Sequence, residues 1–134
     1  MKPITKAWLD SALDDINAIA LLVEEPHLTN VVSFHAQQAV EKSLKALIEE
    51  FEIGIIKTHN LNRLYELVKP QYDPIQDLDM LDQLDAIYIE SRYPNEMGLL
   101  PHGKPSLTEA EQFYNFAKIT YHQIKIKLET DEEA

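Results

Sequence analysis

The stretch FHAQQAVEKSLKALIEEF, residues 34–51, decides the fold, because it is the longest run without Gly or Pro that keeps a helical period. At about 100° per residue, one broad arc collects the small and apolar side chains: Ala36, Ala39, Val40, Ser43, Leu44, Ala46, Leu47, Ile48 and Phe51. The opposite arc holds the rest: Phe34, Gln38, Glu41, Lys42, Lys45 and Glu49. An arc this wide predicts a central helix that contacts several neighbours. We expect Leu47 in the core, Lys45 exposed, and an ion pair between Glu41 and Lys45.

The composition is that of one acidic domain. The chain has 134 residues, of which 45% are hydrophobic, and this predicts a single domain over residues 1–134 with a sizeable core. A net charge of −11 argues against binding nucleic acid by bulk electrostatics, so DNA is not an expected partner. A local RNA site or a basic protein partner stays open. Residues 129–134 are acidic and are expected to form a solvated, frayed tail.

Several function classes lack their sequence signals. No apolar run approaches the roughly 18 residues of a membrane span, and the first residues show no signal-peptide core, so we expect a cytoplasmic protein away from membranes. The sequence has no Cys, no Gly-rich phosphate loop and no HExxH. Its one Glu-x-x-His, from Glu24 to His27, is broken by Pro26. The sequence therefore predicts neither a metal site nor a cofactor.

Two helices are predicted before and after the central one. The first is expected over residues 5–24, with a solvated side that carries Asp10, Asp14 and Asp15 and with an apolar stripe of Trp8, Leu9, Ala12, Leu13, Ile16, Ile19, Ala20 and Val23. The central helix is expected to start at a cap, Thr29 or Asn30, and to end at a left-handed Gly54. Small side chains on its inner arc would let another helix axis come close. A short helix should then bury Leu61, Leu64, Tyr65 and Val68, and stop at Pro70.

Two more helices complete the predicted bundle. Asp73-Pro74 is a typical helix start and Tyr93-Pro94 a typical end, with an inward stripe of Ile75, Leu78, Leu81, Leu84, Ile87 and Tyr88 between them. The last helix follows two overlapping capping boxes, Ser106 with Glu109 and Thr108 with Glu111. Its inward stripe is Ala110, Phe113, Ala117, Tyr121, Ile124 and Leu128. We predict an all-α, antiparallel up-and-down bundle of four long helices and one short helix.

The candidate site residues gather around the irregular stretch 95–105. Arg92 precedes it, and its guanidinium could hold a phosphate in a bidentate fork or simply balance the helix dipole. Tyr93 offers an aromatic face for a base, while Asn95 and His102 lie within the stretch. His59 precedes the short helix, where a structural hydrogen bond and a ligand contact are both open.

For other polar groups the sequence predicts structural rather than functional roles. Asp82 and Asp85, three residues apart, predict a solvated face, with Asp85 as an alternative anchor for a cation such as Arg92. His35, Gln38 and Lys42 share one flank of the central helix and predict a polar rim.

The chain as a whole resembles the HEPN domain family, small helical proteins commonly paired with minimal nucleotidyltransferases. The segments that carry the resemblance span nearly the whole chain: Trp8-Leu9 with Ala12 and Ile16, FHAQQAVEKSLKALI at 34–48, KTHNLNRL at 57–64, YIESRYP at 88–94 and SLTEAEQFYNFA at 106–117. The resemblance implies a homodimer that partners a minimal nucleotidyltransferase in a toxin–antitoxin or nucleotide-related system, with a nucleotide- or RNA-binding cleft near Arg92. We expect either the central helix, with its small side chains, or the helix that starts at Asp73-Pro74 to lie near the two-fold axis.

The resemblance also implies an alternative function. Some family members are metal-independent ribonucleases whose site follows the pattern Arg-x4-6-His, shared between two subunits. In that chemistry the His moves a proton and the Arg stabilises charge on phosphorus. Arg92 matches the arginine of the pattern, whereas His102 follows at a wider spacing, with Pro94 and Pro101 between them. Ribonuclease activity through Arg92 and a displaced His102 is therefore the second hypothesis.

Overall fold

The computed structural model describes residues 1–91 and 104–133, and these residues form helices and connections without strands. Pro3–Leu22 forms α1, the short 3-10 helix η1 covers Pro26–Leu28, and Thr29–Glu50 forms α2. Three helices follow: α3 (Leu61–Val68), α4 (Leu78–Ser91) and α5 (Leu107–Glu133). The predicted all-α bundle of four long helices and one short helix is confirmed.

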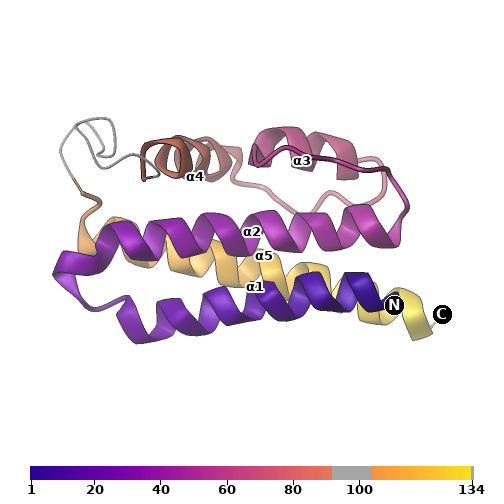
Figure 1. Ribbon diagram of the computed structural model, residues 1–134, viewed down its shortest axis with the longest axis horizontal. Helices are drawn as coiled ribbons and strands as arrows, with labels where there is room; N and C mark the ends of the chain where they lie inside the picture. Colours follow the sequence, from indigo (N-terminus) through magenta and orange to yellow (C-terminus); the bar gives the residue numbers. More distant parts are fainter. Residues whose placement is uncertain (92–103, 134) are drawn as a thin grey trace.

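The helices pack around α2, which runs through the middle of the molecule (Figure 1). α1 lies antiparallel along one side of α2, α3 and α4 follow each other along the opposite side, and α5 packs behind α2 and α1. Both chain ends lie at the same end of the bundle. α4 packs on α2 and α3 but touches α5 only slightly. One helix therefore carries most of the tertiary contacts.

The inner face of α2 is closed on all sides. Ala36, Ala39, Ser43, Ala46 and Leu47 have no exposed surface, as the pattern of small residues predicted. Ser33 and Ser43 donate their hydroxyls to the carbonyls of Thr29 and Ala39, one turn earlier, at 2.9 and 2.7 Å. These buried hydroxyls are thereby satisfied without a partner from another helix.

The ends of α2 differ from the predicted ones. Leu28 occupies the N-terminal cap position without a side-chain hydrogen bond, so the predicted cap at Thr29 or Asn30 is wrong. η1 leads directly into the helix and takes the place of a capping side chain. At the other end Glu52, not Gly54, adopts the left-handed conformation, with φ of 53°.

A Schellman motif explains why Glu52 accepts this conformation. The N–H of Ile53 donates to the carbonyl of Ile48 at 3.0 Å, and that of Glu52 donates to Glu49 at 3.3 Å. The two bonds satisfy carbonyls that the helix end would leave free. Gly54, with φ of 143°, lies beyond the motif in the connection to α3.

α4 starts later than predicted, at Leu78, so Asp73-Pro74 is not its start. The segment before α4 is held by the hydroxyl of Tyr65, which donates to Asp73 and accepts from the N–H of Ile75 at 3.0 Å. Burial and the nearby Asp73 carboxylate raise the pKa of Tyr65 to about 12. Asp77 then accepts from the N–H of Met80 at 3.4 Å at the true helix start.

This shift changes the inward stripe of α4 only at its beginning. Leu78, expected inside, is 48% exposed, because it lies at the first position of the helix rather than in its second turn. Leu81, Leu84 and Ile87 are buried as predicted.

α1 and α5 follow the prediction in most respects. α1 begins and ends two residues earlier than expected, and Ala20, expected inside, is exposed. The capping box of Ser106 and Glu109 is confirmed by bonds of 2.9 and 3.0 Å, whereas Thr108 lies inside α5 and caps nothing. The inward stripe of α5 is confirmed at all six positions. The described part of the acidic end, residues 129–133, is exposed and helical, and fraying of residues 129–134 stays a prediction.

The burial of α2 gives a stability prediction. Leu47→Ala should lower the free energy of unfolding by about 2–5 kcal/mol, because a fully buried leucine leaves a cavity. Leu21, which is 83% exposed on α1, provides the matched control, and Leu21→Ala should change it by less than about 0.5 kcal/mol. Urea melts measure both. Equal losses in the two variants would contradict the packing described for α2.

Candidate functional site

Most of the predicted site residues cannot be placed. Arg92, Tyr93, Asn95 and His102 lie outside the described residues. The ribonuclease hypothesis depends on two of them and stays a prediction. His59 lies within the described part of the chain. Charged and aromatic side chains surround it, and together they form the candidate site.

Side chains of α2 contact both the ring and the backbone carbonyl of His59. Its ring Nδ1 lies 3.0 and 3.1 Å from the two carboxylate oxygens of Glu41. Its backbone carbonyl accepts a hydrogen bond of 3.1 Å from the amide of Gln37. The side chain is nevertheless 50% exposed, so the rest of the ring faces solvent. The predicted structural hydrogen bond is therefore present, on a ring that remains accessible.

Glu41 is buried, with 4% of its surface exposed, although the sequence placed it on the outer arc of α2. Lys45 compensates its charge at 2.9 Å, which confirms the predicted ion pair, and Gln37 donates to the other oxygen at 3.2 Å. Lys45 itself is not exposed as predicted. Its side chain is only 13% exposed, and its ammonium lies 5.3 Å from the ring centre of Trp8 on α1.

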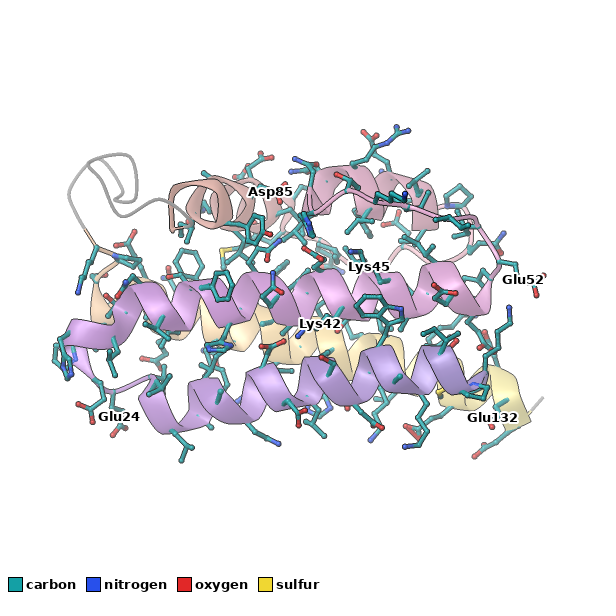
Figure 2. All side chains as sticks on the ribbon, viewed as in Figure 1. Glu24, Lys42, Lys45, Glu52, Asp85 and Glu132 are labelled. Atoms are coloured by element: carbon teal, nitrogen blue, oxygen red, sulfur yellow. The ribbon has the colours of Figure 1, made fainter. Side chains whose placement is uncertain are left out.

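A second network of the same composition lies across the seam between α1 and α2. Asp15 accepts from Lys42 and contacts Nδ1 of His35, both at 2.8 Å. The expectation that Asp15 lies on the solvated side of α1 is wrong, since α2 covers it and leaves 7% exposed. Figure 2 shows Lys42 in this seam. The buried carboxylates of Glu41 and Asp15 are thus each shared by one lysine and one histidine.

Aromatic side chains line the edge of this surface toward α4. The rings of Phe34 and Tyr88 stack, with centroids 6.0 Å apart and planes 14° from parallel. His59 lies on Tyr88 at 5.4 Å, and His35 meets the edge of Phe34 at 5.8 Å. We call Phe34, His35, His59 and Tyr88 the aromatic–histidine surface. Flat rings beside protonatable nitrogens are the groups that bind bases and phosphates.

Asp85 fixes the segment that carries His59. Its carboxylate accepts the N–H of Leu61 at 2.7 Å and that of Asn62 at 3.3 Å, and so caps α3 two residues after His59. Burial raises the pKa of this carboxyl, and the backbone bonds counteract only part of that effect. The predicted solvated face is therefore right for Asp82, which accepts from the Asn62 side chain at 2.6 Å, and wrong for Asp85. Figure 2 shows Asp85 between α4 and α3.

A groove of about 620 Å³ opens between α4 and α5, where the two helices barely touch. Its floor is apolar, with Ile75, Met80 and Phe116. Its rim carries five carboxamides: Gln76, Gln83, Gln112, Asn115 and Gln123. Among the described residues that line it, one is charged, Asp77. A groove with one charged side chain is unusual in a chain with a net charge of −11.

The described residues contain no cluster of three or more His, Cys, Asp or Glu side chains placed to hold a metal ion. None of their helices is long and apolar enough to cross a membrane.

The sequence pattern predicted one of the side-chain interactions of the site and did not predict the others. The spacing of Glu41 and Lys45 indicated their ion pair. Nothing in the local pattern indicated that His59 also meets this carboxylate, or that Asp15 meets His35 and Lys42. Those contacts join residues that lie 18, 20 and 27 positions apart in the chain.

The fold and this surface define a small helical-bundle protein that carries aromatic rings and paired charges on one surface. A family comparison agrees. The HEPN domain matches residues 5–127, nearly the whole chain, and the protein belongs to the HEPN domain family. Comparisons with curated proteins and with solved structures give no match.

The buried charges give a second stability prediction. Lys45→Ala should lower the free energy of unfolding by about 1–3 kcal/mol, because it leaves the buried Glu41 carboxylate without its lysine. The loss exceeds what an exposed lysine would give. Lys6, an exposed lysine paired to Asp10 on α1, is the control, and Lys6→Ala should change stability by under about 0.5 kcal/mol. Thermal melts that rank the two variants equally would argue against a structural role for the Glu41 network.

Proposed function

We propose that this protein is the dimeric partner subunit of a minimal nucleotidyltransferase, in a toxin–antitoxin or nucleotide-related system, and that it binds a nucleotide or RNA at the aromatic–histidine surface. Membership of a family whose members often pair with such enzymes supports the partner role. The observation that carries the binding role is the exposed His59 ring against Tyr88, held from behind by Glu41. A residue with a purely structural role does not need half of its ring in solvent.

The nucleotide would use two kinds of contact. A base can stack on the rings of Phe34 and Tyr88, which tolerates any base because each has a flat π-face. Arg92 comes four residues after Tyr88 in the chain and would supply a guanidinium fork for a phosphate. Tyr93 and Asn95 remain candidates for the same ligand. Such a local site suits an acidic chain that lacks a broad basic face.

The dimer contact needs a different face from the one the sequence suggested. The small residues of α2 were expected to bring two copies together, but α1 and α5 already cover them. The groove between α4 and α5 offers the alternative, with Leu78 and Ile119 about half exposed beside it. Two copies of charge −11 repel each other least where they meet through uncharged carboxamides. We place the two-fold contact at this groove, which agrees with α4 near the axis.

The dimer gives a prediction that light scattering tests. The wild-type protein should have twice the mass of a 15.4 kDa chain at micromolar concentration. Ile119→Arg should shift it toward the monomer, because it places a charge in the groove. Leu21→Arg, on α1 far from the groove, should leave the dimer intact. A wild-type monomer would reject the proposed assembly.

Nucleotide binding is tested by recording backbone NMR shifts during titration with ATP, AMP and a short RNA. We expect shifts at Phe34, His59 and Tyr88. Tyr88→Leu should weaken binding by about fivefold or more, since it removes a stacking face. Tyr114→Leu on α5 is the control aromatic change. Shifts confined to α5, or none with any ligand, would contradict the proposed surface and leave the partner role to be judged on its own.

A further inference from the structure

The contact between Glu41 and Nδ1 of His59 decides whether the outward nitrogen, Nε2, carries a hydrogen in the neutral ring. A carboxylate only accepts hydrogen bonds, so Glu41, with both oxygens within 3.1 Å of Nδ1, requires a proton on that nitrogen. Lys45 pairs with the same carboxylate at 2.9 Å. In a neutral His59 the outward Nε2 then carries a lone pair and no hydrogen. The neutral ring therefore presents an acceptor to solvent.

A phosphate also presents only acceptors when it is fully ionised. Its oxygens cannot form a hydrogen bond with a lone pair on Nε2, and the two groups would repel each other. They can bind once Nε2 takes up a second proton, because the imidazolium then donates a charge-assisted bond. The geometry at Glu41 thus links phosphate binding to proton uptake.

We propose that His59 is the phosphate contact of the aromatic–histidine surface, and that a phosphomonoester binds there with uptake of a proton at Nε2. The inference rests on the proposed nucleotide binding and names the chemical group that is recognised and the condition that controls it. Glu41 acts as a positioning residue, since it touches His59 and not the ligand. Because binding takes up a proton, the affinity should fall as the pH rises.

The charges around His59 allow an imidazolium to form. From α2, Glu41 faces Nδ1 and Lys45 balances Glu41. From α4, Tyr88 lies against the ring, while Asp82 and Asp85 face the first residues of α3. The Glu41 carboxylate lies against the ring, and a bound phosphate would place a second negative charge beside it. Because Asp85 already accepts two backbone N–H groups, it does not compete for the outward nitrogen.

His35 has the same partners but a poorer position for a ligand. Asp15 holds its Nδ1 and Lys42 balances Asp15, as in the first network. Its side chain is 29% exposed, against 50% for His59, and it meets Phe34 by an edge. His59 is therefore the nitrogen that a ligand stacked beside Tyr88 would reach.

Calorimetry of AMP binding to the full-length protein, at about pH 7 in PIPES, HEPES and Tris, tests this coupling. Proton uptake makes the measured enthalpy vary with the ionisation enthalpy of the buffer, and the slope gives the number of protons taken up. AMP itself titrates at about pH 6, so the informative quantity is the difference in slope from His59→Gln. We expect this variant to lose most of the slope and to bind AMP about tenfold more weakly. His122→Gln, an exposed histidine on α5, should behave as wild type.

Further experiments distinguish a positioning role of Glu41 from a packing role. They also distinguish recognition of the phosphate from recognition of the base. Glu41→Gln should reduce the slope while AMP still binds, because its amide can donate to Nδ1 and leave the proton on Nε2. His59→Gln alters an exposed ring and keeps Glu41 paired with Lys45, so the test does not depend on the folding of the buried variant. Adenosine should bind more weakly than AMP without buffer dependence. The difference in slope between wild type and His59→Gln should be the same for inorganic phosphate as for AMP.

The failures of the two proposals are distinguishable. AMP binding with the same slope in wild type and His59→Gln would overturn the inference and leave the proposed nucleotide binding standing. Equal affinity for adenosine and AMP would overturn the phosphate contact in the same way. No binding of AMP at all would overturn the proposed nucleotide binding and the inference together.

Discussion

The constraint on which the structure depends is the enclosure of α2. Of its 22 residues, 13 are buried, including four that are polar besides the Thr29 that opens it: Ser33, Gln37, Glu41 and Ser43. A polar group taken out of water must find a partner inside the protein. The two serines use the helix backbone one turn earlier. Gln37 and Glu41 are too long for that solution and require groups from elsewhere in the chain.

The position of His59 follows from that requirement. Gln37 donates to the carbonyl of His59, and Glu41 accepts from its ring, so the buried polar groups of α2 fix the connection that leads to α3. Asp85 fixes the same connection from α4 by capping α3. A loop that could have moved freely is tied to two helices. The resulting rigidity is useful for recognition, because a preset side chain loses little entropy when a ligand binds.

The distribution of charge separates two surfaces with different uses. On the α1 and α4 sides of α2, carboxylates are paired with lysines and histidines, so an acidic chain still presents protonatable donors there. Between α4 and α5 the lining is nearly free of charge. Charged contacts depend on pH and salt, whereas a groove of carboxamides and apolar groups does not. The proposed role of a subunit that meets both a partner and a small ligand suits this division.

The sequence by itself determined which segments are helical and which faces of α2, α3 and α5 are buried. Those properties depend on residues three or four positions apart, which a periodic pattern reveals. The pattern also gave the ion pair of Glu41 and Lys45 and the capping box at Ser106. It erred where the chain had an alternative to the usual signal. Asp73-Pro74 looked like a helix start, but the hydroxyl of Tyr65 holds that segment extended.

Only the tertiary structure decided the candidate site. Asp15 and Glu41 looked solvated because each lies beside polar neighbours on its own helix, and packing against another segment buried them. His59 became distinctive only when α2 supplied its partners and α4 supplied Tyr88. The physical reason is that helical periodicity reports which side of a helix faces inward, and not which residue of another segment arrives there. Burial of a charge is decided by that second segment, and so is its chemistry.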